Sequence, residues 1–246
     1  MRHFIRIKKN NLVCFYESAS IGLCYRSTFN SYYFSYILFN QDLNYEISLP
    51  TQKLICMNPS NDIQSDHAAM AIILDAMENR AQEILKNGNV DFFRIGQILD
   101  FLHNYADNLH YAKEERILFP AVMDANKPWI SKTINNLIHE HALARNYIKE
   151  IGNHLNACLA GNADALPKLG SVMLKYVELE KNHIKVEDDV VMPLFKRLQN
   201  SKKMEGFKFE FKELPDKKID HLKYLEYYRL INILSTENIY GSKPER

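Results

Sequence analysis

The stretch His110-Tyr-Ala-Lys-Glu114-Glu-Arg-Ile-Leu-Phe-Pro120 has a second copy in His183-Ile-Lys-Val-Glu187-Asp-Asp-Val-Val-Met-Pro193. Both copies read His-x3-Glu followed by an acidic residue, with a proline ten residues after the histidine. On a helix, residues four apart lie on one face, about 6 Å apart along the axis, so each copy presents one imidazole and one carboxylate to the same point. Two such helices facing each other would supply half or more of a dinuclear metal site.

The apolar residues around both copies recur at helical spacing and predict four long amphipathic helices. These helices cover about 61–87, 91–125, 128–160 and 165–200, and Gly88 and Gly161 follow two of them as stop signals. Short connectors between long helices favour an antiparallel up-down four-helix bundle, so the predicted fold class is all-α. Pro120 and Pro193 lie inside two of the helices and predict a kink in each. A fifth helix is predicted at about 216–236.

Each helix of the predicted bundle has a histidine in its apolar stripe. An unpaired buried carboxylate is costly, so Glu114 and Glu187 facing one core need a reason, and bound cations supply one. Imidazole with carboxylate and no thiolate suits iron, manganese or zinc, and two bridging carboxylates among four imidazoles suit a non-haem di-iron pair. A single His-x3-Glu is more often a surface pair, but the repetition favours a metal site. The predicted metal ligands are His67, His110, Glu114, His141, His183 and Glu187.

Charge and composition count against several other functions. The formal net charge of +1 gives no reason to expect nucleic acid or an anionic membrane as the main partner. No apolar run approaches the ~18 residues of a membrane span, and Glu17 and Ser18 interrupt the stretch that a signal peptide would need. The four cysteines form no Cys-x2-Cys pair and no evident disulfide framework, which favours a reducing cytoplasm.

Residues 1–58 differ from the rest of the chain and are treated as an N-terminal extension of unknown role. They are rich in Tyr, Phe, Asn and Ser, and short strands or irregular structure are predicted near 11–16, 32–39 and 44–49. One hypothesis is that Met57 is the natural start; the alternative is an extension that packs on the domain. The predicted domains are therefore 1–58, the bundle at 59–200, and a linker, C-terminal helix and tail at 201–246.

The order His, His-x3-Glu, His, His-x3-Glu resembles the hemerythrin-like (HHE cation-binding) family over about residues 60–198. The resemblance implies that the six predicted ligands bind two irons, with Glu114 and Glu187 bridging them together with an oxo, hydroxo or water ligand. The last predicted helix also resembles the C-terminal helix that many bacterial members append. The likeness is carried by Asp66-His67, the segment 105–120, Glu140-His141-Ala-Leu-Ala-Arg145 and the segment 183–193.

The chain departs from the oxygen-carrying members of that family at two positions. They have a fifth histidine one turn before the third-helix ligand, where this chain has Leu137. They use an Asp five residues after the last histidine, which is Asp188 here, but Glu187 matches the spacing of the second helix and is the predicted ligand. The missing histidine counts against simple oxygen carriage and favours relatives that bind or sense O2, NO, peroxide or iron. The sequence leaves open whether such a protein turns over as an enzyme.

Two alternative functions make different predictions. A ferritin-like di-iron oxidase or peroxidase is suggested by Glu180-x2-His183, but that fold also needs a Glu from each of two other helices, which offer His67 and His141 instead. A metal-free helical bundle acting as an interaction module predicts no bound metal and no loss of its function on chelation.

Overall fold

The structure is a computed structural model. It describes residues 5–7, 12–15, 23–26, 59–123, 128–198, 211, 214, 219 and 221–240. The chain forms two compact units, Met1–Met57 and Asn58–Arg246, and each is described by itself.

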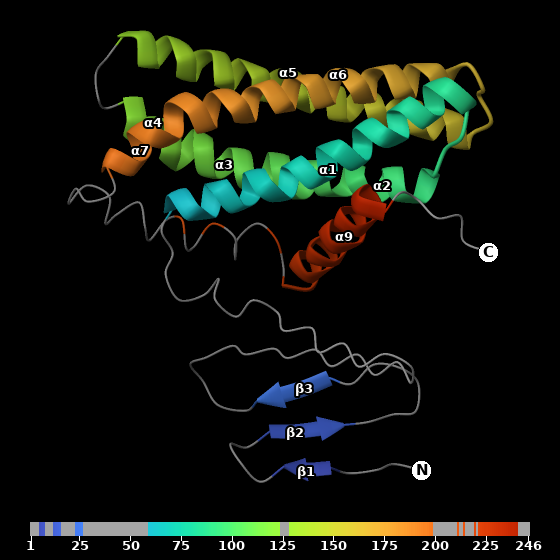
Figure 1. The fold of residues 1–246 in the computed structure, drawn as a ribbon, viewed down its shortest axis with the longest axis horizontal. Helices are drawn as coiled ribbons and strands as arrows, with labels where there is room; N and C mark the ends of the chain where they lie inside the picture. The colour runs from blue at the N-terminus through green and yellow to red at the C-terminus, as the bar shows by residue number, and fades with distance from the viewer. Residues whose placement is uncertain are drawn as a thin grey trace. The chain divides into compact units, whose positions relative to one another are not determined.

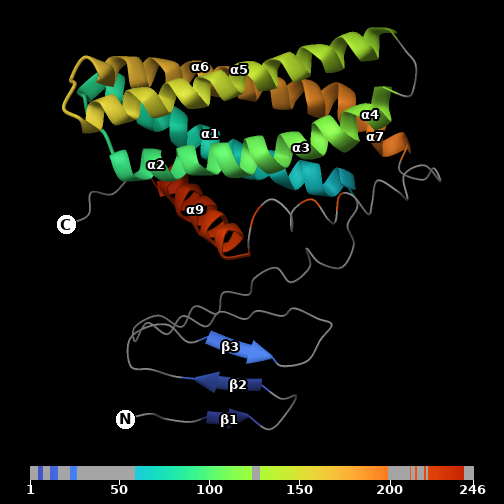
Figure 2. The ribbon, with the colours of Figure 1, turned by 180° about the vertical axis from the view of Figure 1, so that it is seen from behind.

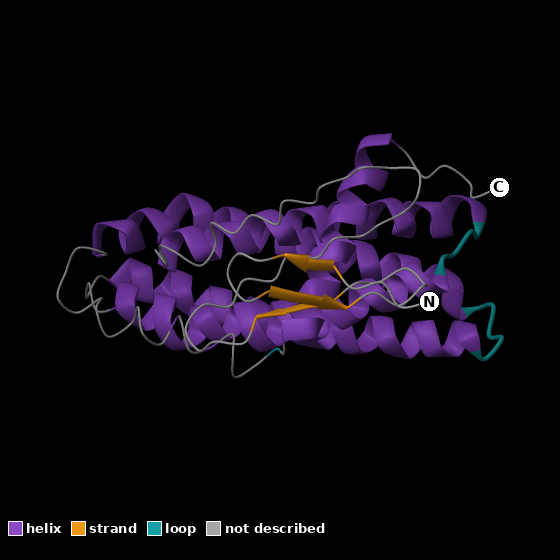
Figure 3. Cartoon of the chain, turned by 90° about the horizontal axis from the view of Figure 1, so that it is seen from below, coloured by secondary structure: helices purple, strands orange, loops and turns teal. Residues whose placement is uncertain are grey.

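The first unit contains a three-stranded antiparallel sheet in the order β1-β2-β3, drawn in orange in Figure 3. The strands are β1 (Ile5–Ile7), β2 (Leu12–Phe15) and β3 (Leu23–Arg26), and the register places Cys14 opposite both Ile5 and Cys24. The strand predicted near 11–16 is β2. The strands predicted near 32–39 and 44–49 lie outside the described residues.

The second unit is built around four long helices that run antiparallel to one another in chain order (Figure 1, and from behind in Figure 2). The first and third are α1 (Pro59–Asn87) and α5 (Pro128–Leu159). The second helix consists of α2 (Phe92–Phe101), η2 (Leu102–His110), α3 (Tyr111–Lys113), η3 (Glu114–Leu118) and α4 (Phe119–Met123). The fourth helix consists of α6 (Ala165–Val186), η4 (Glu187–Val191) and α7 (Met192–Leu198). The predicted helical bundle is confirmed.

Local signals explain where these helices begin and end. The Asp91 side chain accepts a hydrogen bond of 2.8 Å from the backbone N–H of Arg94 and caps α2. Gly88 follows α1 with a φ of 68°, and Gly161 follows α5 with a φ of 87°. Positive φ favours glycine because it has no Cβ, so both positions end a helix as predicted.

The prolines inside the second and fourth helices are preceded by π-helical turns. After η3, the N–H of Phe119 donates to the carbonyl of Glu114, five residues earlier. After η4, the N–H of Met192 donates in the same way to the carbonyl of Glu187. A proline cannot donate to the residue four before it, and its ring crowds that carbonyl. The sequence predicts a kink at each proline. The structure shows a wider, π-helical turn just before each of them.

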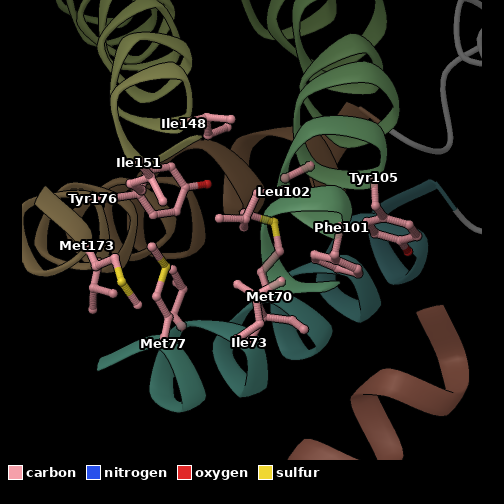
Figure 4. Packing of buried hydrophobic residues seen from close by; sticks show 14 of the residues in the cluster. Met70, Ile73, Met77, Phe101, Leu102, Tyr105, Ile148, Ile151, Met173 and Tyr176 are labelled. Atoms are coloured by element: carbon pink, nitrogen blue, oxygen red, sulfur yellow. The ribbon is translucent and has the colours of Figure 1, made fainter. Parts of the chain in front are cut away.

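Two apolar clusters fill the bundle, and the candidate ligands lie between them. On α1, Ile63 belongs to one cluster and Met70 to the other, and His67 lies between them in the sequence. On α5, Leu137 and Ala144 flank His141 in the same way. Figure 4 shows part of the larger cluster, where side chains of four helices meet. Burying a large apolar side chain stabilises the fold by about 1.5–3 kcal/mol, so these clusters hold the polar layer in place.

The fifth helix, predicted at about 216–236, is α9 (His221–Tyr240). It begins and ends a few residues later than predicted and packs against α1. Its Glu237 forms ion pairs of 2.5 Å with Arg80 on α1 and 3.1 Å with Arg94 on α2. Its Tyr227 is buried and donates a hydrogen bond of 3.1 Å to Asp100. Of the helices described, none is long and apolar enough to cross a membrane.

Candidate metal centre

The structure brings all six predicted ligands together in the middle of the bundle, and all six are buried. His67 comes from α1, His110 and Glu114 from the second helix, His141 from α5, and His183 and Glu187 from the fourth helix. The two glutamates begin the π-helical turns η3 and η4. The shared His-x3-Glu spacing therefore delivers its two side chains to one place from each helix.

The six side chains form two overlapping groups that share both glutamates. One group is His67, His110, Glu114 and Glu187, and the other is Glu114, His141, His183 and Glu187. Within each group, one ligand atom from every residue lies within 4.8 Å of the others. Sharing two carboxylates between two imidazole pairs is an arrangement that could hold two adjacent metal ions.

Each glutamate turns one oxygen towards each half of the site. Glu114 Oε1 lies 2.9 Å from Nε2 of His110, and its Oε2 lies 3.2 Å from Nε2 of His141. Glu187 Oε2 lies 3.1 Å from Nε2 of His67, and its Oε1 lies 3.4 Å from Nε2 of His183. All four imidazoles therefore point Nε2 inwards, and both carboxylates are oriented to bridge.

Several of these atoms have no hydrogen-bond partner within the described residues. They are buried and comprise Nε2 of His67, Nε2 of His110 and both carboxylate oxygens of Glu114 and Glu187. The Nε2 atoms of His141 and His183 lie 3.1 Å apart, so only one can donate to the other. A buried polar group without a partner costs about 1–3 kcal/mol. Cations would satisfy all of these lone pairs at once, so the donor set fits metal ions.

Burial and the carboxylates oppose each other in setting the charge of the imidazoles. Desolvation would lower the pKa of His67, but its hydrogen bond to Asp188 and the nearby carboxylates of Glu114 and Glu187 raise the pKa to about 12. Desolvation is likewise outweighed at His110, where Glu114 and Asp66 raise the pKa to about 9. Burial would raise the pKa of Glu114, but the imidazoles hold that pKa well below its usual range. Metal binding would displace any proton that these imidazoles carry on Nε2.

Four further carboxylates face the Nδ1 atoms of the imidazoles, and the order of these contacts follows the chain around the bundle. Asp66 of α1 lies 3.4 Å from Nδ1 of His110 on the second helix. Glu115 of the second helix lies 2.8 Å from Nδ1 of His141 on α5.

The ring is completed by the other two carboxylates. Glu140 of α5 lies 2.8 Å from Nδ1 of His183 on the fourth helix, and Asp188 of the fourth helix lies 2.9 Å from Nδ1 of His67 on α1. Such contacts fix the imidazole tautomer and raise its basicity towards a metal. These four roles were not predicted from the sequence, although each of the four carboxylates lies directly beside a candidate ligand in the chain.

Asp66 and Glu115 are themselves held by charged and hydroxyl groups. Asp66 Oδ2 accepts from Lys113 Nζ at 2.6 Å, and its Oδ1 accepts from the Tyr105 hydroxyl at 2.6 Å. Lys113 is buried and also pairs with Asp62 at 2.6 Å. Glu115 accepts from Arg145 at 2.9 Å. These contacts fix the carboxylates that orient His110 and His141.

The position of Glu180 separates this site from a ferritin-like one. In that alternative, Glu180 would be a ligand together with His183. Its Oε1 instead accepts a hydrogen bond of 2.6 Å from the Tyr111 hydroxyl, and Glu180 belongs to neither ligand group. Desolvation raises the pKa of the Glu180 carboxyl, which favours its neutral form. Asp107, the weaker counterpart in the second helix, pairs with Arg145 at 2.6 Å.

Apolar residues lie around Leu137, the position at which the oxygen-carrying proteins mentioned above have a fifth histidine. Leu137 is buried in the smaller apolar cluster, together with Phe119. The Phe119 ring lies 5.7 Å from the His141 ring, and the Tyr111 ring stacks on His141 at 3.9 Å. Two aromatic rings therefore lie against His141. His103, a histidine of the same helix as His110, is exposed and belongs to neither group.

In a comparison with protein families, residues 58–210 match the hemerythrin HHE cation binding domain. That range contains all six candidate ligands and the four carboxylates around them. No curated protein and no solved structure matches the chain.

Proposed function

The chain belongs to the hemerythrin HHE cation binding domain family, and we propose that it holds two iron ions in a carboxylate-bridged centre. The six ligands of this proposal are His67, His110, Glu114, His141, His183 and Glu187. One observation carries it: two four-residue groups share Glu114 and Glu187, and most of their inward-facing atoms have no hydrogen-bond partner. Imidazole and carboxylate without thiolate are ligands that suit iron.

The pair of irons would supply a redox-active centre for a small ligand such as O2, NO or peroxide. The chain's own residues determine how that ligand is received. Leu137 and Phe119 close one side of the site with apolar surface, which keeps water away from it. Leu137 also contributes no nitrogen, so a metal ion held by His141 and His183 would keep a coordination position for a ligand from outside. We propose binding or sensing of such a ligand as the function.

Metal analysis of protein purified without added metal tests this proposal. We expect about two irons per chain, as the ligand types favour, and near-ultraviolet absorption that anaerobic reduction removes. His110→Ala and Glu187→Ala should each lower the iron content. His103→Ala is the matched control, because His103 lies on the same helix as His110 but is exposed and outside both ligand groups.

The possible outcomes separate the alternatives. Iron retained in full by both ligand variants would refute the assigned site. One zinc per chain, with no visible or near-ultraviolet band, would refute the iron pair but keep a metal site. No metal in the wild type, even after anaerobic addition of Fe(II), would refute the proposal and leave the metal-free interaction module.

A further inference from the structure

The helix α9 lies beyond residue 210, where the family match ends. Two sets of contacts fix it to the bundle. Glu237 pairs with Arg80 and Arg94 near its C-terminal end. Nearer its start, Tyr227 packs edge-on against Phe101, with ring centroids 5.3 Å apart, and lies 6.1 Å from the Tyr105 ring. Figure 4 shows Phe101 and Tyr105 close together on the second helix.

Tyr105 connects this aromatic contact to the candidate metal centre. Its ring stacks on Phe101 at 4.8 Å and faces α9, while its hydroxyl donates to Asp66 Oδ1 at 2.6 Å. The other oxygen of Asp66 faces Nδ1 of His110. An unbroken series of contacts therefore runs from α9 through Tyr105 and Asp66 to a candidate ligand.

The last contact in this series is looser than its three counterparts. The Nδ1 atoms of His67, His141 and His183 lie 2.8–2.9 Å from their carboxylates. Nδ1 of His110 lies 3.4 Å from Asp66 and makes no hydrogen bond within the described residues. Asp66 is instead held at 2.6 Å by both Lys113 and Tyr105. A cation on Nε2 makes the Nδ1–H of an imidazole a stronger donor, so metal binding would draw His110 and Asp66 together.

We propose that Tyr105 is a positioning residue that couples the docking of α9 to metal binding at the His67–His110 half of the site. The inference rests on the proposed function, because it needs metal to bind there. A shift of Asp66 towards His110 moves the acceptor of the Tyr105 hydroxyl, and the Tyr105 ring forms part of the surface on which α9 docks. Coupling between two sites is reciprocal, so metal strengthens the docking of α9 by the same factor by which docked α9 strengthens metal binding.

Hydrogen exchange of the α9 backbone amides in the full chain measures this coupling. The protein is compared without metal and after anaerobic addition of Fe(II). Amides of α9 that exchange faster than the slowest amides of α6 report local opening of α9 rather than unfolding of the bundle. We expect Fe(II) to slow their exchange by about fivefold or more, the lower end of measured coupling between sites.

Two variants separate coupling from docking. Tyr105→Phe keeps the ring that packs against α9 but removes the hydroxyl, which contacts both Asp66 and Tyr224 of α9. Exchange of α9 should therefore be faster in this variant with and without Fe(II), and the Fe(II)-dependent slowing should disappear. Its Fe(II) affinity should also fall by about tenfold, the lower end for loss of an outer contact of a metal ligand. Glu237→Gln weakens docking at the other end of α9 without touching this series of contacts. It should speed exchange of α9 equally with and without Fe(II), leaving the ratio unchanged.

The outcomes keep the two proposals distinct. A wild type that takes up no Fe(II) overturns the proposed function. A wild type that takes up two ions with no change in α9 exchange overturns the coupling alone. The coupling is also overturned if Tyr105→Phe retains the full Fe(II)-dependent slowing, or if α9 exchanges only together with the whole bundle.

Discussion

Replacing Asp66 with Asn should destabilise the metal-free protein far more than replacing Glu140 with Gln. Both carboxylates face Nδ1 of a candidate ligand, so the two variants remove similar contacts from the metal centre. Their surroundings differ. Asp66 is fully buried and accepts hydrogen bonds from Lys113 and Tyr105, whereas Glu140 is 31% exposed and, among the described residues, pairs with His183.

The expected size follows from what Asn can still do. Its single carbonyl oxygen can keep one of the two 2.6 Å contacts, with Tyr105 or Lys113. Breaking a buried ion pair outright costs about 3–5 kcal/mol. Lys113 keeps its second carboxylate, Asp62 at 2.6 Å, so we expect a loss of about 2–4 kcal/mol. Glu140→Gln should cost about 0.2–1 kcal/mol, as for a partly exposed pair.

Urea unfolding of the metal-free proteins measures both values, with the slope against urea expected to stay constant. The pH dependence gives a second check. The pKa of Asp66 lies well below its usual range, with burial opposing that shift and Lys113 and His110 driving it. Its stabilisation is therefore present above the ordinary Asp pKa of about 4 and is lost as the pH falls towards the folded value. The deficit of Asp66→Asn should shrink in that range. Equal losses for the two variants at neutral pH would refute this account.

Three further outcomes are expected. Gly170→Ala should lower stability by about 1–2 kcal/mol, because its Cβ would lie 2.9 Å from Leu85 Cγ. Gly96→Ala, with nothing within 4 Å of its Cβ, should raise stability by about 0.5–1 kcal/mol. Urea unfolding should therefore show changes of opposite sign in the free energy of unfolding of the two variants. Fe(II) at about 100 times its Kd should raise Tm by about 5–10 °C in anaerobic thermal unfolding, and an unchanged Tm would contradict binding to the folded state. Leu137→His should lower the stability of the metal-free protein by about 1–3 kcal/mol, because it places a polar group in the smaller apolar cluster. This loss of stability should be smaller in the metal-loaded protein, since an imidazole that binds the metal has a partner. An equal loss in both states would show that residue 137 does not reach the metal.

The sequence was enough to predict the bundle and to bring its six candidate ligands to one place, because both depend on short-range patterns. Helix ends follow from single residues such as Asp91 and Gly88. The His-x3-Glu spacing places two side chains on one helix face whatever the partner helices do. The choice between Glu187 and Asp188 as the inward-facing residue also followed from that spacing, and the structure places Glu187 in both ligand groups.

Contacts between helices were harder to predict. Asp66 lies beside His67 in the sequence but contacts His110, because the carboxylate of α1 faces the neighbouring helix. Nothing in the local sequence states which helix is the neighbour. The same holds for Tyr105, whose apolar ring is typical of a core position while its hydroxyl finds Asp66 across the bundle. The sequence also did not predict that the π-helical turns η3 and η4 begin at the two glutamates. A proline inside a helix predicts that the helical hydrogen bonds are disrupted, but it does not predict which kind of turn results.

The bundle has two halves, α1 with the second helix and α5 with the fourth helix. Exchanging these halves maps the ring of outer carboxylates onto itself. The contact from Asp66 to His110 becomes the contact from Glu140 to His183, and the contact from Glu115 to His141 becomes the one from Asp188 to His67. Each half is a helical hairpin that supplies two candidate histidines, one shared glutamate and two outer carboxylates, and one outer carboxylate of each half reaches a histidine of the other. A hairpin of this kind, paired with an identical copy of itself, would close the same ring, so the contacts around the candidate centre have an approximate twofold symmetry within one polypeptide.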